Sequence, residues 1–248
     1  MSDEKFKFPT EVVELPSKGL IYPEDNPLSS GKIEMKYMTA KEEDILTNQN
    51  YITRGTVIDK LIQALVVDKS IKYGDILAGD KNVLLVAARI LGYGENYEFE
   101  YNGEKHTVDL SKLDNKPIDD SLFETGKNEF TYSLPTSGKN ITFKLLTHQD
   151  DLDIDQEIKG LKKVNKDSSA EMSTRLKYII QSVDGKVDQK TIRNFVDNEF
   201  LARDARAFRN YYASIQPDLD LTFYPENGPE EGVDIPIGIN FLWPDANL

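Results

Sequence analysis

The chain has 248 residues, carries a formal net charge of -13 and contains no cysteine. The lack of cysteine excludes disulfides, thiolate catalysis and zinc held by cysteine. The acidic balance argues against nonspecific binding to nucleic acid and to anionic membranes, because both depend on lysine and arginine. No apolar run reaches the roughly 18 to 20 residues that span a bilayer, and the N-terminus does not resemble a signal peptide. We therefore expect the protein to remain in the compartment where it is made, or in an assembly built there.

The N-terminal part predicts two strands separated by a kinked ribbon that runs from Leu15 to Tyr22. Pro16 favours an extended residue before it, and Gly19 can adopt a positive φ without steric cost. The ribbon carries no catalytic base or metal ligand, so it indicates an interaction protein more than an enzyme. The expected boundaries are 1–9 for a flexible polar N-terminus, and Glu11–Leu15 and Lys32–Met38 for the strands.

Three helices are expected next, each from a different signal. Thr39 and Glu42 have the spacing of a capping box at a helix start. A wide apolar stripe at helical spacing marks a second helix from about Thr56. The third is expected over Lys81–Leu91, with Asp80 as its N-cap.

Alternating residues then predict two β-hairpins. The first has strands at Tyr97–Tyr101 and Lys105–Leu110, joined by Asn102-Gly103, a dipeptide that favours a tight turn. The second has strands at Glu129–Leu134 and Asn140–Leu146. Between the hairpins lies a polar connector rich in Asp, Lys and Pro.

The C-terminal part predicts a return to helices and then to strands. Helices are expected at about 148–163, 169–183, 188–197 and 199–215, and strands at Leu219–Tyr224 and Val233–Trp243. Strands and helices are grouped along the chain and do not alternate, so the pattern predicts an α+β fold with hairpins and no parallel wound sheet. The connector at 114–128 is expected to divide an N-terminal module, 10–113, from a C-terminal module, 129–248, unless both share one core.

No local pattern specifies a catalytic or metal site. Asp151, Asp153 and Asp155 imitate the start of a calcium loop, but the sixth position lacks the glycine that the sharp turn needs. The two histidines, His106 and His148, have no carboxylate at a spacing that would mark a metal site or a general base. We interpret them as surface or capping residues.

Arg203, Arg206 and Arg209 recur at every third position and predict a basic strip on a helix. Because the whole chain is acidic, we expect them to pair with acids such as Asp204 and Glu199, or with a partner's carboxylates, in preference to nucleic acid. The aromatic residues of the same helix are assigned to the core, with an interface as the alternative. They are Phe208, Tyr211 and Tyr212.

Five short segments, taken in order, carry a family resemblance. They are Leu15-Pro16-Ser17-Lys18-Gly19 with Tyr22; Lys32–Met35 leading into Met38–Leu46; Leu77 and Asp80 with Arg89, Tyr93, Gly94 and Tyr97; Leu201 and Asp204 with Arg206 and Arg209; and Val233, Ile235 and Pro236 running to Phe241, Trp243 and Pro244. Together they resemble the baseplate hub and hub-assembly proteins of T-even-like contractile-tailed phages, and related tail-assembly proteins. The segments span nearly the whole chain, which argues against chance agreement.

One departure from that family concerns metal binding. Many of its members carry Cys-x-x-Cys at two hairpin positions, which here read Tyr101–Glu104 and Tyr224–Gly228. The resemblance therefore implies that the turns persist here without metal ligands, and no cofactor is expected.

The resemblance implies a non-enzymatic structural or assembly protein of a phage tail baseplate hub. Its partners would be other tail or baseplate proteins, with an oligomer inside an assembly as a further option, and without nucleic acid or membrane. It would act in the host cytoplasm during assembly or stay in the virion baseplate. Trp243 would be a binding anchor or would close the core. The candidate interface residues are Leu15, Pro16, Ser17, Gly19, Tyr22, Arg89, Tyr93, Gly94, Asp204, Arg206, Arg209, Phe241 and Trp243.

Two other functions remain open at this stage. One is a carboxylate-based hydrolase or another metal-dependent enzyme, which would bring distant acids together in a deep pocket and raise their pKa values. The other is a cellular adaptor protein unrelated to phage.

Overall fold

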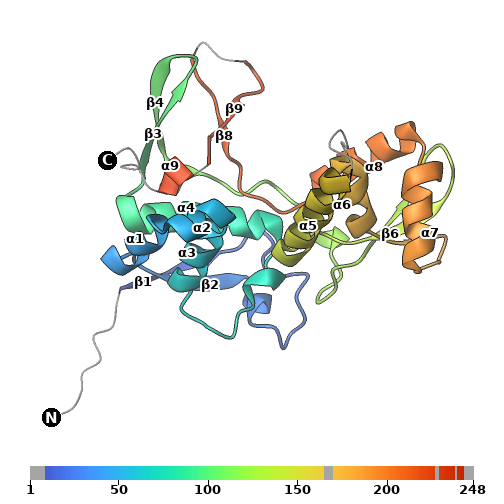
Figure 1. The fold of residues 1–248 in the computed structure, drawn as a ribbon, viewed down its shortest axis with the longest axis horizontal. Coiled ribbons are helices and arrows are strands. Elements are labelled where there is room, and N and C mark those ends of the chain that lie inside the picture. The colour runs from blue at the N-terminus through green and yellow to red at the C-terminus, as the bar shows by residue number, and fades with distance from the viewer. Residues whose placement is uncertain (1–8, 165–169, 227–228, 238, 243–248) are drawn as a thin grey trace.

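The computed structural model describes residues 9–164, 170–226, 229–237 and 239–242, and it has the α+β fold that the sequence predicts. The predicted flexible segment 1–9 lies outside these ranges except for Pro9. Small antiparallel sheets and helices follow one another along the chain, and no parallel strand pair occurs within the described ranges. The long helix α4 (Ala78–Tyr93) runs through the middle of the N-terminal half (Figure 1).

The two N-terminal strands form a hairpin beside α4. β1 (Thr10–Glu14) pairs antiparallel with β2 (Lys32–Lys36), as the two predicted strands suggest. The ribbon between them needs Gly19, whose φ is +76° and whose added Cβ would lie 2.5 Å from the carbonyl oxygen of Ser29. Both conditions exclude other residues at this turn.

Three helices follow, one more than expected before α4: α1 (Ala40–Leu46), α2 (Gln49–Arg54) and α3 (Val57–Leu65). The capping box is confirmed, because the Glu42 carboxylate accepts from both the backbone and the hydroxyl of Thr39. The sequence did not predict α2, since six residues are too few for a helical period to show. The apolar stripe of α3 is confirmed, and its buried members are Val57, Leu61, Ile62 and Leu65.

The start of α4 differs from the prediction. The helix begins at Ala78 after Leu77 as N-cap, so Asp80 is its third residue and not its cap. Gly79 lies in the same turn, and a Cβ there would be 1.8 Å from the carbonyl oxygen of Pro217. The chain that follows the last long helix therefore crosses α4 at backbone contact, which only glycine allows.

Two hairpins form an arm that projects from the body (Figure 1). β3 (Asn96–Tyr101) and β4 (Glu104–Asp109) form the first, as predicted, and Asn102 and Gly103 both have positive φ, at 53° and 81°. This is the geometry of a tight hairpin turn. Beside it, the short strands β8 (Thr222–Phe223) and β9 (Val233–Asp234) form the second.

The predicted strand Val233–Trp243 is wrong beyond Asp234. Pro236 cannot donate to a strand ladder, and the chain then forms a helical turn, α9 (Ile239–Leu242). Phe241 is fully buried in it, and Trp243 lies outside the described residues.

Between the connector and Ile215, the described part of the chain combines a three-stranded sheet with four helices. β5 (Phe130–Ser133) and β6 (Asn140–Phe143) form the predicted hairpin, and β7 (Ile180–Val183) joins β6 antiparallel. The sequence assigned β7 to a helix, because a short buried apolar run fits either element. The helices are α5 (His148–Val164), α6 (Glu171–Ile179), α7 (Gln189–Asn194), extended by a π-helical turn at Phe195–Glu199, and α8 (Ala202–Ile215). None of the helices in the described ranges combines the length and apolar character needed to cross a membrane.

The connector 114–128 is bonded to both halves of the chain. The Lys116 N–H donates to the Asp218 carbonyl at 2.9 Å, and the Gly126 N–H donates to the Leu20 carbonyl at 2.8 Å. The buried apolar residues form one cluster with members on both sides of the connector.

The close crossing at Gly79 can be tested against a second helical glycine. We expect Gly79→Ala to lower the free energy of unfolding by about 2 kcal/mol or more, because the Cβ would overlap the Pro217 carbonyl. In α5, Gly160 has no atom within 4 Å of an added Cβ, so Gly160→Ala should raise the free energy by about 0.5 to 1 kcal/mol. Denaturant unfolding measures both changes. Small changes of the same sign at the two sites would contradict the crossing.

Candidate functional site

Asp80 joins the kinked ribbon to the first turn of α4. The backbone N–H and the hydroxyl of Ser17 donate to its two carboxylate oxygens at 2.9 and 2.7 Å, and the Tyr22 hydroxyl donates to Oδ2 at 3.2 Å. The Tyr22 hydroxyl also accepts from the Leu77 N–H at 3.0 Å, a group with no partner inside the helix. The ribbon is therefore fixed to one helical turn through polar contacts.

The Asp80 carboxyl is fully buried, and no lysine or arginine pairs with it among the described residues. Burial raises its pKa to about 6, although the hydrogen bonds from Ser17 and Tyr22 favour the charged form. Loss of any one partner would leave a buried polar group unsatisfied, which is costly. The ribbon and α4 are thus strongly coupled.

Arg89 closes the opposite end of α4. Its guanidinium donates to the carbonyl oxygens of Gly94 and Asn96 at 2.9 and 3.1 Å. It also lies against the rings of Tyr93 and Tyr97, an arrangement that cation–π attraction stabilises. These residues therefore shape the turn that leads from the helix into the β3–β4 hairpin.

The C-terminal segment is attached to this same end. The Tyr97 hydroxyl donates to the Pro236 carbonyl at 3.0 Å, and its ring lies edge-on to Phe241 at 4.8 Å between centroids. The Tyr93 hydroxyl donates to Glu43 of α1 at 3.1 Å. Of the five segments that carry the family resemblance, the first, second and fifth thus each contact the third, which is on and beside α4.

Most residues of the predicted interface set belong to the core. Their burial means that the ribbon and Phe241 are architectural and do not present exposed apolar anchors. The buried members are Leu15, Pro16, Ser17, Gly19, Tyr22, Arg89, Asp204 and Phe241. Trp243 lies outside the described ranges.

The fifth segment, on α8, is used elsewhere. Asp204 is buried and accepts from the backbone N–H groups of Thr136 and Ser137 at 2.7 and 2.9 Å. Burial would raise its pKa, but these donors outweigh it and hold the pKa below its usual value. Asp204 therefore closes the turn between β5 and β6.

The arginines of α8 do not pair as expected. Asp204 is occupied by that turn, and Glu199 forms an ion pair with Lys139. Arg203 and Arg206 are exposed and have no partner within the described part of the chain. The expected pairing is wrong for these two acids.

At the two positions where the resembling family carries cysteine pairs, the described residues Tyr101–Glu104 and Tyr224–Glu226 lie on the arm and line one cavity. Phe99 and His106 both contact the Phe223 ring across the hairpins, with centroids 5.3 and 5.2 Å apart. His106, predicted at the surface, is half-buried in this contact. Within the described ranges, no three or more His, Cys, Asp and Glu side chains lie together in a way that could hold a metal ion. A cavity of about 520 Å³ lies between the turns and is lined in part by Tyr101, Glu104, Tyr224 and Glu226.

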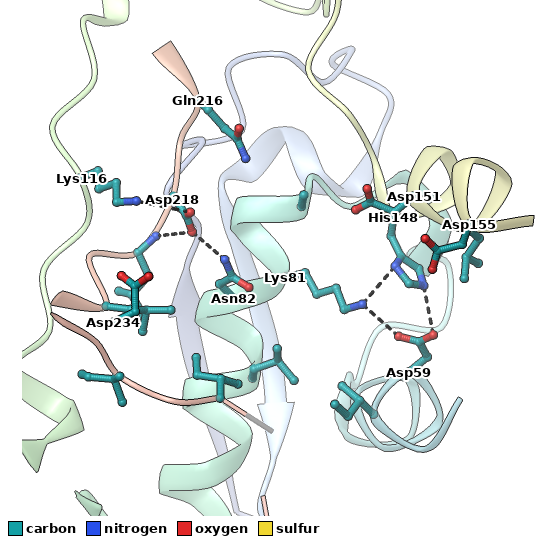
Figure 2. A pocket seen from close by; sticks show the side chains of 18 of the residues that line it. Asp59, Lys81, Asn82, Lys116, His148, Asp151, Asp155, Gln216, Asp218 and Asp234 are labelled. Carbon is teal, nitrogen blue, oxygen red and sulfur yellow. Dashed lines mark hydrogen bonds and ion pairs between the residues drawn. The ribbon is translucent and has the colours of Figure 1, made fainter. Parts of the chain in front are cut away.

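A polar cavity of about 640 Å³ lies where α3, α4, α5 and the chain after α8 meet. Figure 2 shows two groups of side chains on its walls. In one, Asn82 donates to Asp218 at 2.8 Å and Lys116 lies 3.7 Å from the same carboxylate. The other group consists of Asp59, Lys81 and His148.

His148 was predicted at the surface or as a cap, and this is wrong, because it is buried between two charged side chains. Its Nε2 lies 3.3 Å from Asp59 Oδ2, and its Nδ1 lies 3.2 Å from Lys81 Nζ. A lysine ammonium can only donate, so Nδ1 accepts and Nε2 carries the proton that is shared with Asp59. Both ring nitrogens are occupied, which leaves neither for general base catalysis on a molecule in the cavity.

Asp59 is the acceptor at the centre of this group. Lys81 lies 3.1 Å from one of its oxygens, and the Tyr73 hydroxyl donates to the same oxygen at 3.2 Å. Burial would raise the pKa of Asp59, but the hydrogen bond from His148 and the charge of Lys81 hold it below its usual value. A catalytic carboxylate acid would need the opposite shift. The arrangement is that of an ion-pair network in which the imidazole is buried and the Asp59 and Lys81 side chains are partly buried.

Comparisons with protein-family models, with curated proteins and with solved structures give no match for this chain. The family resemblance therefore rests on the five segments alone.

The burial of Asp80 predicts a specific pH dependence of stability. Its pKa is about 6 in the folded chain and is raised from its usual value, so its contribution is greatest with the carboxyl protonated. That contribution should fall by up to about 3 kcal/mol as the pH rises from about 4 to 7. The Asp80→Asn variant cannot titrate there. The unfolding free energy of the unchanged protein minus that of Asp80→Asn should therefore fall as the pH rises over this range. A difference that is independent of pH would contradict the buried acid.

A comparison of two aspartates that line the polar cavity tests whether the contacts of Asp59 stabilise the fold. We expect Asp59→Asn to lower the free energy of unfolding by about 2 kcal/mol, because it leaves Lys81 and His148 without their charged partner. Asp155 lines the same cavity but is exposed, so Asp155→Asn should change stability by less than about 0.5 kcal/mol. Thermal and denaturant unfolding compare the two. A neutral Asp59→Asn would show that the group is not structural.

Proposed function

We propose that the chain is a component or an assembly factor of the baseplate hub of a contractile phage tail, and that it acts by binding other tail proteins. The observation that carries the proposal is the contact of four of the five resembling segments around α4. Ser17 and Tyr22 bind Asp80, Tyr93 binds Glu43, and Tyr97 binds Pro236. The residues that carry the resemblance in these four segments therefore belong to one structural unit built on α4, and this shared unit supports the proposal.

A binding role is also supported by the polar groups of the large cavity. Asp59, Lys81 and His148 satisfy one another, and Asn82 and Asp218 do the same. These polar groups therefore bond to one another within the protein, as in a structural network. The arm formed by the two hairpins offers a surface away from this core (Figure 1).

The enzyme alternative has one observation in its favour, the position of the His148–Asp59 pair on the wall of a cavity of about 640 Å³. For catalysis, Lys81 would first have to leave Nδ1 of the imidazole. The alternative therefore needs a rearrangement, whereas the binding proposal does not. The cellular adaptor differs from both in the genes that surround it, which would not be tail genes.

Interruption of the gene in its phage tests the proposed role. With a suppressible stop codon, a nonpermissive host should produce filled heads without complete contractile tails, as seen by electron microscopy. A plasmid-borne copy of the chain should restore the tails, and Gly160→Ala should restore them equally because its added Cβ meets no atom within 4 Å. Mass spectrometry of purified virions then separates a retained component from a factor that leaves after assembly.

Normal contractile tails in the absence of the chain would exclude the baseplate role. A gene that lies outside any cluster of tail genes would favour the cellular adaptor.

A further inference from the structure

An apolar pocket opens between α6 and α8. Its volume is about 260 Å³, and Met172, Leu176 and Ile179 of α6 face Phe208 and Tyr212 of α8 across it. Met172 is 55% exposed, so the pocket is open to solvent at this edge. A water molecule takes up about 30 Å³ of liquid, so the pocket has the volume of several waters. That is enough space for one large apolar side chain.

Arginines from both helices surround the opening. Arg175 and Arg209 line the pocket. Arg175 lies 3.0 Å from Asp151, yet half of its side chain remains exposed. Arg209 contacts the sulfur of Met172 and has no acidic partner within the described ranges. Arg206 lies on the same side of α8, one turn earlier, and is exposed.

The residues that line this pocket include two arginines and no acid, although the whole chain has a net charge of -13. A second copy would carry the same excess of negative charge, and repulsion between the copies opposes such a pairing. The chain's own segment 165–169, Asn-Lys-Asp-Ser-Ser, has no apolar side chain to place in the pocket. Nucleic acid would use the arginines, but its bases stack on aromatic faces, and half of the pocket is aliphatic.

We propose that this pocket, the α6–α8 pocket, binds an acidic segment of another protein. One large apolar side chain of that segment fills the pocket, and carboxylates on either side of it pair with Arg175, Arg206 and Arg209. The residues that dominate binding energy are typically side chains that fill a well-packed pocket, and arginine is common among them. The charges orient the segment and accelerate its arrival.

The inference goes beyond the proposed place of the chain in a tail. The pocket shares no residue with the contacts of Asp80, Tyr93 and Tyr97 that support that proposal. Loss of tail assembly and loss of segment binding can therefore be told apart.

Selection of a random peptide library on the full chain tests the inference. The enriched peptides should share one large apolar residue with Asp or Glu on both sides. A fluorescent copy of the tightest peptide should bind about tenfold or more weakly to the Met172→Glu variant and to the Arg209→Glu variant. Both changes are at side chains that are at least partly exposed, and denaturant unfolding verifies that each variant folds.

Arg54→Glu provides the matched control. Arg54 is exposed at the end of α2, away from the pocket, and its reversal changes the net charge by the same amount as Arg209→Glu. Binding to this variant should stay within about twofold of the unchanged chain. A peptide with its acids replaced by lysine should fail on the unchanged chain and bind when Arg206→Glu and Arg209→Glu are combined.

Several results would overturn the inference. No enriched peptide, or peptides without the acidic and apolar pattern, would exclude the stated partner. Equal binding to Arg209→Glu and to Arg54→Glu would place the contact elsewhere. A dimer in sedimentation that Arg209→Glu abolishes would assign the pocket to a second copy. Displacement of the peptide by a DNA oligonucleotide would assign the arginines to nucleic acid.

Discussion

The buried carboxylate of Asp80 is the contact on which the rest of the structure depends. It holds the ribbon against the first turn of α4 through Ser17 and Tyr22, and the ribbon in turn bonds the connector through the Leu20 carbonyl. The neighbouring Gly79 admits the backbone of the chain that leaves α8. Because a buried carboxyl is stable only while its partners are in place, one helical turn fixes segments that are far apart in the sequence.

The distribution of polar contacts separates architecture from surfaces that are free to bind. Around the large cavity, Asp59, Lys81 and His148 bond to one another and leave little for a ligand. On α8, in contrast, Arg206 is exposed and Arg209 lines the α6–α8 pocket, and neither has an acidic partner in the described ranges. Charges that are satisfied internally contribute to folding, whereas unpaired arginines beside an apolar pocket can bind another molecule. This contrast is what favours the proposed binding role over the enzyme alternative.

Signals that act over a few residues made much of this fold predictable. The capping box of Thr39 and Glu42 and the Asn102-Gly103 turn are both local, and both are confirmed. Asp80 was assigned to a cap because its true partners, Ser17 and Tyr22, are 63 and 58 residues away. The pairing of His148 with Asp59 has no local signal either. β7 and α9 were assigned to the wrong element because short apolar runs suit strands and helices alike. The candidate site escaped prediction because it is built from such distant contacts.

The direct test of the central role of Asp80 is hydrogen exchange at the backbone amides of Ser17 and Leu77, which bond to Asp80 and to Tyr22. If the carboxylate ties the ribbon to α4, both amides should exchange only when the whole chain unfolds, with the same free energy as global unfolding. The two amides should also lose protection together in Asp80→Asn. Exchange of the Ser17 amide through a local opening of much lower free energy, with Leu77 still protected, would contradict the account.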